Sequence, residues 1–287
     1  MPYLGAHMSI AGGMHLAFER LKEIRGSALQ IFTTNHRQWR SDKLSPLTIE
    51  LFKYRWKQNG GIQVAAHGIY LINLAARDKL VLSRSISALA EELVRCANLG
   101  IQYLIMHPGA HLGEGTEAGL IRFVENLDRA IETSGVESVS VLIENTAGQG
   151  SSLGSSFEEI NFILRNSRFG ETMGVCYDTS HGFAAGYDMR DEEAYRFTLS
   201  KFDGAIGIGR LRFFHLNDSK RELGSRVDRH EHIGKGKIGL NGFRLLLNDP
   251  RFRDHPMVLE TPKGKDLKED KENMGVLRSL LESRNVR

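Results

Sequence analysis

Nine side chains of this chain have the type and spacing to bind divalent metal ions. Asp178-x-x-His181 and Asp228-x-His230 let two neighbouring side chains converge on one ion. The other five donors lie at or just past the ends of short apolar runs: His67, His107, Glu144, His215 and Glu260. Imidazole and carboxylate ligands without a cysteine suit Zn²⁺, with Mn²⁺ or Fe²⁺ as the nearest rivals. The pattern therefore predicts a metal centre.

The number of donors indicates more than one ion. A zinc site uses only about four ligands, so nine donors imply two or three ions with at least one shared carboxylate. Three divalent ions carry more charge than four carboxylates neutralise, which would leave the centre positive. Paired ions about 3.5–4 Å apart suit the in-line displacement of a phosphodiester. We therefore expect phosphate chemistry at this centre.

Eight apolar runs predict the strands that position these donors. Most are apolar throughout, which is typical of parallel strands buried on both faces. The runs are Tyr3–Ala6, Ala28–Thr33, Gln63–Ala66, Tyr103–Met106, Ser140–Ile143, Gly174–Tyr177, Leu211–Phe214 and Met257–Leu259. Helix-like segments alternate with them: Met14–Ile24, Thr48–Asn59, Leu80–Leu99, Glu117–Ser134, Ser156–Asn166, Asp191–Ile206, Gly242–Leu247 and Asn273–Ser283. Eight βα units without a composition break predict an α/β fold, a single (β/α)8 TIM barrel over residues 1–287.

The first polar residues after the strands carry most of the functional signal. They are His7, Asn35, His67, His107, Glu144, Asp178, His215 and Glu260. Barrel enzymes place their chemistry at the C-terminal ends of the strands, so these side chains should ring one mouth. One histidine after a strand is usually a hydrogen-bonded structural residue. An unbroken run of such residues from His67 onward favours an active site.

Three loops have the composition of nucleic-acid-binding segments. The Lys220–Gly239 loop is basic and rich in glycine, and coordination through Asp228 and His230 would pin it over the mouth; otherwise it would be a solvated, flexible loop. Asn35–Arg40 mixes guanidinium groups with an indole. Tyr70 and Leu71 follow His67, where they can wedge into a base stack or simply pack at a helix start.

Composition places limits on the partners and the compartment. The chain has 287 residues, 41% of them hydrophobic, and a net charge of only +3, so affinity for a polyanion must come from local patches. Cys96 and Cys176 are too few for a disulfide framework, which indicates a reducing compartment. We find no leader and no apolar run long enough for a membrane span. We therefore expect a cytoplasmic protein.

The motifs closely resemble those of endonuclease IV, the trinuclear zinc apurinic/apyrimidinic endonucleases. The resemblance covers essentially the whole chain, and Asp-Thr-x-His together with Asp-Arg-His is highly specific. Ser180 stands where some members have cysteine, and Gly68-Ile69 also differs from some members. The matching segments are Gly5–Ser9, Ile31–Arg40, His67–Leu74, His107–Gly109, Ile143–Gly150, Cys176–Asp188, His215–Asp218, Gly224–His230 and Leu259–Thr261.

The resemblance implies a role for each site residue. It assigns three Zn²⁺, with Mn²⁺ or Fe²⁺ possible at one site, and catalytic roles for Glu144 and Glu260. The first ion would be held by His67, His107 and Glu144; the second by a bridging Glu144 with Asp178, His215 and Glu260; the third by His181, Asp228 and His230. Side chains that would enter the DNA at the lesion are Arg37, Tyr70 and Leu71. From the composition of the basic loop, we also expect Arg226 and Arg229 to contact DNA.

The activity implied is hydrolysis of the phosphodiester 5′ to an abasic site in double-stranded DNA, giving 3′-hydroxyl and 5′-deoxyribose phosphate ends, with 3′-end cleaning. Access of a duplex to the mouth favours a monomer. A one-metal sugar isomerase could use Glu144, Asp178, His215 and Glu260, but it leaves five donors without a role. A DNA-damage binding protein with structural metals is a further hypothesis, but structural zinc sites are usually closed four-ligand cages, whereas nine donors shared among three ions leave open positions. The metal site is also compatible with a metallophosphatase for small phosphoesters, and the lesion loops argue against it.

Overall fold

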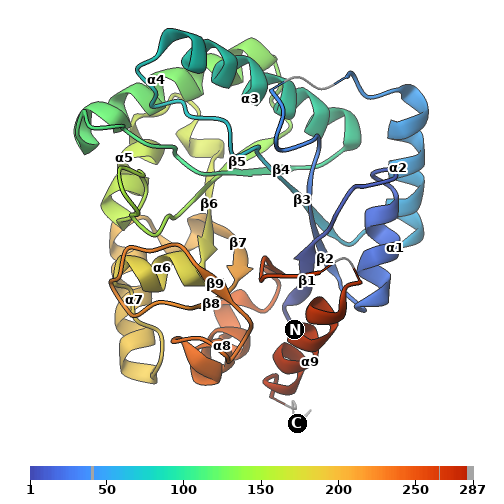
Figure 1. The fold of residues 1–287 in the computed structure, drawn as a ribbon, viewed down its shortest axis with the longest axis vertical. Helices are drawn as coiled ribbons and strands as arrows, with labels where there is room; N and C mark the ends of the chain where they lie inside the picture. The colour runs from blue at the N-terminus through green and yellow to red at the C-terminus, as the bar shows by residue number, and fades with distance from the viewer. Residues whose placement is uncertain (40–41, 265, 283–287) are drawn as a thin grey trace.

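A closed barrel of eight parallel strands forms the centre of the molecule (Figure 1). The computed structural model describes residues 1–39, 42–264 and 266–282. Around the barrel the strand order is β1-β10-β7-β6-β5-β4-β3-β2. The strands are β1 Tyr3–His7, β2 Ala28–Phe32, β3 Gln63–His67, β4 Tyr103–Met106, β5 Ser140–Glu144, β6 Gly174–Asp178, β7 Leu211–Leu216 and β10 Pro256–Leu259. The predicted TIM barrel is confirmed; its assignment as one domain over residues 1–287 stays a prediction.

Helices surround the ring of strands (Figure 1). Polar residues begin several of them: Asp78 accepts hydrogen bonds from the Leu80 and Val81 amides at the start of α3, and Ser45 caps α2 in the same way. The helices are α1 Leu16–Glu23, α2 Pro46–Gln58, α3 Lys79–Leu99, α4 Thr116–Ser134, α5 Phe157–Asn166, α6 Thr179–Ala185, α7 Glu192–Ala205, α8 Gly239–Asn248 and α9 Lys268–Ser279. Single 3₁₀ turns span Gly170–Thr172, Ile208–Arg210 and Pro250–Phe252.

The structure adds elements that periodicity did not predict. Helix α6 is too short to show an apolar period, and the hairpin of β8 (Asp218–Ser219) with β9 (His230–Glu231) pairs two-residue strands that are distant in sequence. Helix α9 begins at Lys268 rather than Asn273, because its first turn is polar; the predicted end at Ser283 lies outside the described residues. Among the described residues, no helix is both long and apolar enough to cross a membrane.

The barrel is filled by its own side chains below the mouth. A buried layer inside it consists of Ala28, Ala65, Ile105, Leu142, Cys176, Phe213 and Val258. A larger apolar layer joins the strands to the surrounding helices. Both cysteines, Cys96 and Cys176, are buried and free. The apolar floor leaves only the C-terminal rim of the strands for polar chemistry.

Candidate metal centre

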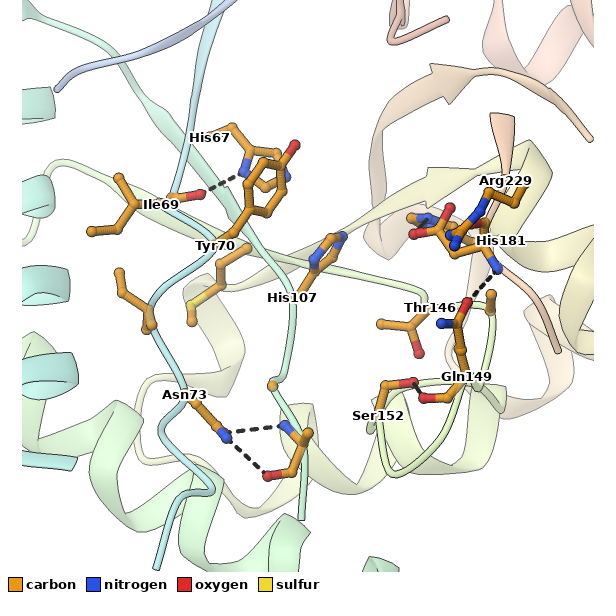
Figure 2. A pocket seen from close by; sticks show the side chains of 17 residues that line it. His67, Ile69, Tyr70, Asn73, His107, Thr146, Gln149, Ser152, His181 and Arg229 are labelled. Carbon is orange, nitrogen blue, oxygen red and sulfur yellow. Dashed lines mark hydrogen bonds and ion pairs between the residues drawn. The ribbon is translucent and has the colours of Figure 1, made fainter. Parts of the chain in front are cut away.

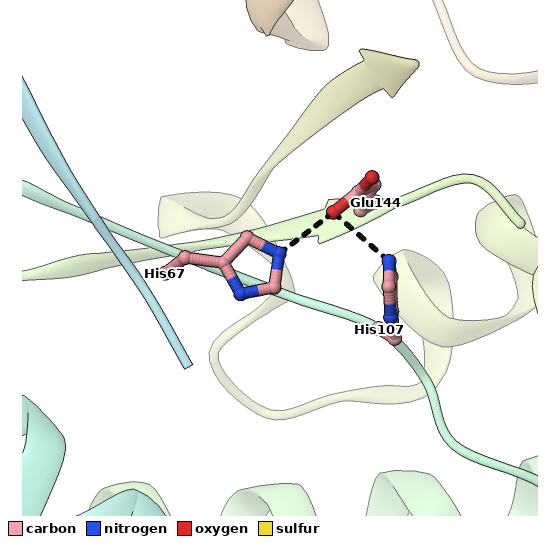
Figure 3. A group of neighbouring side chains, drawn as sticks. All are labelled: His67, His107 and Glu144. Carbon is pink, nitrogen blue, oxygen red and sulfur yellow. Dashed lines mark hydrogen bonds and ion pairs between the residues drawn. The ribbon is translucent and has the colours of Figure 1, made fainter. Parts of the chain in front are cut away.

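Glu144, the last residue of β5, lies at the centre of the cluster. Its side chain is fully buried, and its Oε2 lies 3.0 Å from Nε2 of His67 and 3.1 Å from Nε2 of His107 (Figure 3). Its Oε1 lies 3.0 Å from Nδ1 of His215 and 3.3 Å from Nδ1 of His181. The two oxygens therefore face different groups of histidines, as a carboxylate that bridges two ions must do.

A second group surrounds the other oxygen of Glu144. Ligand atoms of Glu144, Asp178, His215 and Glu260 all lie within 4.8 Å of one another. His215 Nδ1 is 3.2 Å from Oε2 of Glu260 and 3.8 Å from Oδ2 of Asp178. These residues end four strands of the barrel or follow them directly. The group therefore combines three carboxylates with one imidazole.

The third group reaches outward from the barrel. Nε2 of His181 and Nε2 of His230 are 3.4 Å apart, and each lies 3.3 Å from an oxygen of Asp228. Asp178 also approaches, with Oδ2 at 3.8 Å from His230 Nε2, and its ligand atom lies within 4.8 Å of those of His181 and His230. Asp228 is about half exposed. Asp178 thus stands between the second and third groups.

Asp178 is held by four hydrogen bonds, one from the His181 amide and three with the side chains of Asn217 and Asn145. Its Oδ1 accepts a hydrogen bond of 2.8 Å from the His181 amide and so caps α6, while its Oδ2 accepts one of 2.6 Å from Asn217 Nδ2. Asn145 accepts from the Asp178 amide and donates to the Asp178 carbonyl. The Asp-x-x-His spacing is therefore the spacing of a capped first helical turn, which directs both side chains to one side.

The loop that carries Asp228 and His230 is tied down at several points. The carboxylate of Asp218 accepts backbone hydrogen bonds from Ser219, Gly234, Gly236 and Ile238. Pairing of β8 with β9 closes the loop, and the Asp228 amide donates to Oε1 of Gln149 at 3.0 Å (Figure 2). These contacts hold the loop over the mouth, so it is not simply a solvated segment.

The electrostatics of the cluster fit a set of divalent cations. Burial disfavours a charged imidazole, but the carboxylates of Asp178, Asp228 and Glu144 hold the pKa of His181 well above its usual value. Burial likewise disfavours ionisation of Asp228, yet contact with His181 lowers the pKa of that carboxyl to about 2. Without ions, protons on the histidines must balance the buried carboxylates. Cations between these same oxygens and nitrogens satisfy both partners, so the residues present fit bound metal.

Gln30 is a site residue that the sequence analysis missed. It lies on β2 with no exposed surface, and its Nε2 donates to Oε1 of Glu260 at 2.6 Å. Its Oε1 lies 2.7 Å from Nε2 of His215 and therefore accepts the proton of that nitrogen. This arrangement leaves Nδ1 of His215 free to face Glu144. Its only sequence signal is an uncharged polar residue inside an apolar run.

His7 joins the same network at the end of β1. Its Nδ1 lies 3.0 Å from Oε1 of Glu260 and 2.9 Å from Nε2 of Gln30. Burial lowers the pKa of His7 to about 4, against the opposing effect of the Glu260 carboxylate. His7 is thus a neutral imidazole that supports Glu260. The sequence marked it as the polar residue after the first strand but gave it no role.

The predicted DNA-contacting residues lie on loops around the mouth. Tyr70 is 57% exposed and stacks near the ring of His107, at 6.0 Å between centroids, while Leu71 is half-buried against the core. Arg37, Arg226 and Arg229 are exposed, and Trp39 packs partly against the core. Arg40 lies outside the described residues. Of the two proposed wedges, Tyr70 is the one that projects.

Two hollows flank the cluster. One, of about 390 Å³, lies between the β3 loop and the basic loop, where His67, Tyr70, His107, Gln149 and Arg229 line it (Figure 2). The other, of about 910 Å³, lies on the far side of Tyr70, where Phe32, Glu260 and Lys263 contribute to its wall. Some of the candidate ligands therefore border open space: His67, His107, His181 and Asp228 line the first hollow, and Glu260 lines the second.

Several known proteins resemble this chain in sequence and in fold. A family model described as a xylose isomerase-like TIM barrel matches residues 18–280. A protein of Chloroflexus aurantiacus named "Probable endonuclease 4" is 47% identical over 282 residues, 98% of this chain and 99% of its own. The crystal structure of endonuclease IV from Thermus thermophilus matches with a TM-score of 0.88 and 37% identity over 97% of this chain and 98% of that one. A D-tagatose 3-epimerase-like protein shares the fold, with a TM-score of 0.74 and 16% identity over 97% of this chain and 96% of that one.

Proposed function

Because this chain belongs to the endonuclease IV family, we propose that it hydrolyses the phosphodiester 5′ to abasic sites in duplex DNA. It is a DNA-repair hydrolase of DNA phosphodiester bonds, and its clustered histidines and carboxylates support the use of metal ions. The finer proposal is three Zn²⁺, with Mn²⁺ or Fe²⁺ possible at one site. The products are a 3′-hydroxyl and a 5′-deoxyribose phosphate.

One observation supports a multinuclear site over a one-metal isomerase. The two oxygens of Glu144 face separate histidine groups, with His67 and His107 on one side and His215 and His181 on the other. A single ion held by Glu144, Asp178, His215 and Glu260 leaves the outer imidazoles of His181 and His230 without a role. Their approach to each other and to Asp228 supports a further ion.

The chain's own residues would divide the work of incision. Bound divalent ions lower the pKa of water and neutralise charge on the phosphate and the departing oxygen. Glu144 and Glu260 fix the spacing of the inner groups, and the neutral His7 and Gln30 hold Glu260 in place. The abasic sugar would enter beside Tyr70. Because it carries no base, turning it out of the duplex costs less unstacking energy than turning out an intact nucleotide. Arg37 and Leu71 would hold the duplex open.

The basic loop would supply the contacts to the DNA backbone. Arg226 and Arg229 are exposed on the segment pinned by Asp218 and Gln149, so their guanidinium groups are presented beside the metal-binding residues. Binding through phosphate contacts should weaken steeply with salt. We also propose that the protein acts as a cytoplasmic monomer, since a duplex needs free access to the mouth. Blocked 3′ ends would be hydrolysed at the same centre.

The test is incision of a duplex that contains one tetrahydrofuran abasic analogue. This analogue cannot undergo β-elimination, so a nick with a 3′-hydroxyl end demonstrates hydrolysis. The same duplex without the analogue is the control for specificity, and chelated protein is the control for metal. We expect a single nick 5′ to the analogue that requires metal. Absence of a nick with fully metal-loaded protein contradicts the proposal.

A further inference from the structure

Arg95 on α3 joins the two ends of the loop that follows β2. Its Nε donates to the Thr33 carbonyl at 3.1 Å, and its Nη2 donates to the same oxygen. Its Nη1 donates to the Asp42 carbonyl at 2.8 Å. Thr33 comes directly after β2, and Asp42 lies beyond the segment that carries Arg37. One guanidinium group therefore bridges the backbone on both sides of a loop predicted to bind DNA.

A buried carboxylate on the same helix completes this contact. Glu92 is one turn before Arg95 and only 2% exposed, and its Oε2 accepts a hydrogen bond from Oγ1 of Thr33. That hydroxyl oxygen in turn accepts from Nε of Arg95 at 3.2 Å. The result is a chain of hydrogen bonds from guanidinium through hydroxyl to carboxyl. It fixes both the backbone and the side chain of Thr33.

Burial of Glu92 at this position is energetically unfavourable. Burial raises the pKa of its carboxyl to about 7, although Thr33 and Arg95 oppose the shift. Its Oε1 is buried and has no hydrogen-bond partner within the ranges that the structure describes. A buried polar atom without a partner destabilises the folded protein. The stability of the barrel alone therefore does not account for it.

The position of the pair connects two of the predicted DNA-binding loops. Glu92 and Arg95 line a small cavity together with Trp39 from the β2 loop and Ile69 from the β3 loop. Ile69 directly precedes Tyr70, the exposed aromatic side chain. Helix α3 thus contacts the underside of both loops, while their upper faces border the mouth. A fixed platform beneath these loops would set their shape before DNA binds.

We propose that Arg95 and Glu92 are positioning residues that hold the two described ends of the β2 loop, at Thr33 and Asp42, in place for DNA binding in the free protein. Closing a loop in advance lowers the ordering cost that DNA binding would otherwise meet. The pair does not touch the metal-binding residues, so its effect falls on substrate binding rather than on the chemical step. This inference rests on the proposed function.

The test compares Arg95→Lys and Arg95→Ala with the wild-type protein. Lysine keeps the charge but cannot reach both carbonyls, and Glu92→Gln keeps an acceptor for Thr33. Arg210→Ala is the matched control, because Arg210 also bridges backbone carbonyls, those of Gly170 and Glu171, at the opposite end of the barrel. Incision of the tetrahydrofuran duplex gives KM and kcat. Tryptic cleavage after Arg37 in DNA-free protein reports the order of the loop.

We expect both Arg95 variants to raise KM about tenfold or more with kcat within about twofold, and to speed cleavage after Arg37. Glu92→Gln should lie between them and the wild type. Arg210→Ala should lower the melting temperature without either change. Wild-type KM and slow cleavage in folded Arg95→Ala overturn the inference. If the wild-type protein fails to incise the duplex, the proposed function fails instead, while faster cleavage after Arg37 still shows that Arg95 holds the loop.

Discussion

The inner and outer halves of the metal centre are built in different ways. Glu144, Asp178 and His215 end or lie within barrel strands and are fully buried. Asp228 comes from the loop between β8 and β9 and is about half exposed, and His230 is the first residue of β9. The inner half is fixed by strand register, whereas the outer half depends on loop anchors such as Asp218. The barrel strands alone therefore position the inner half, whereas the outer half requires an additional loop.

This difference between the two halves indicates which part of the protein is specialised for phosphodiester chemistry. Barrels of sugar-epimerase type share this fold at low identity, so the fold alone does not specify phosphodiester chemistry. The pinned basic loop adds Asp228 and His230 to the centre and also presents Arg226 and Arg229. Under the proposed function, this one segment would provide both metal ligands and phosphate contacts. The halves should then respond differently to mutation.

Glu144→Ala should have the largest effect, because both inner groups depend on this carboxylate. We expect loss of most bound zinc and a fall in incision of at least about 10³-fold, equivalent to about 4 kcal/mol. Zinc per chain by mass spectrometry and the incision rate are the two measurements. Glu132→Ala, an exposed glutamate on α4, is the control. Full metal content with full incision would refute the bridging assignment.

Asp228→Ala should remove the outer half and spare the inner one. We expect zinc content to fall by about one ion per chain and incision to fall about 10²-fold or more, because even loss of a residue that only supports a metal ligand costs about 10–100-fold. Ser225→Ala in the same loop controls for loop disturbance. If this variant loses as much zinc as Glu144→Ala, the two halves are not independent.

Gln30→Leu tests the support of the inner half without removing a ligand. Without this amide, Glu260 loses a hydrogen bond and the tautomer of His215 is no longer fixed. We therefore expect the zinc affinity to fall about 10–100-fold. Competition with a chelator of known affinity measures this change. Asn126→Leu removes another buried amide, one bonded to the Leu74 and Arg122 carbonyls, and should leave zinc affinity unchanged. Equal affinities in wild type and Gln30→Leu argue against this role.

The smallest expected effect is on pH dependence. Carboxylates raise the pKa of His181 in the metal-free protein, and this proton must leave before the nitrogen can bind an ion. The protonated, metal-free form is therefore stabilised at low pH. This stabilisation is lost as the pH rises through the raised pKa of His181, and the affinity for zinc rises over the same pH range. Asp228→Asn removes one of these carboxylates and should move the rise in zinc affinity to lower pH. Zinc titrations at several pH values would show an unshifted curve if Asp228 has no such effect.

Sequence patterns predicted the inner half better than its surroundings. Glu144, Asp178 and Glu260 were found because each charged residue follows an apolar strand. Gln30 was missed because it is a single uncharged residue inside such a strand, and its partners come from distant strands. Helix α6 and the β8–β9 hairpin were missed because they are stabilised by tertiary contacts rather than by periodicity.

The structure does not test the individual residue roles that the resemblance implies. The structure brings the predicted ligands to one rim, but it places Asp178 between two groups rather than in one. Tyr70 projects as a wedge would, whereas Leu71 is half-buried against the core. Side-chain exposure depends on loop shape, which spacing along the chain does not encode. The assignments to individual ions and to DNA stay predictions.

The carboxylate of Asp178 has two tasks, since it caps α6 and faces the metal-binding nitrogens. The cap uses Oδ1, whereas Oδ2 is the oxygen nearer His215 and His230. A metal ion bound through Oδ2 would leave the cap in place and would add a second restraint to the first turn of α6. Under the proposed function, thermodynamic linkage would then make amide hydrogen exchange in this turn slower as the concentration of free zinc rises. The first turn of α6 would thus report how far the metal sites are filled.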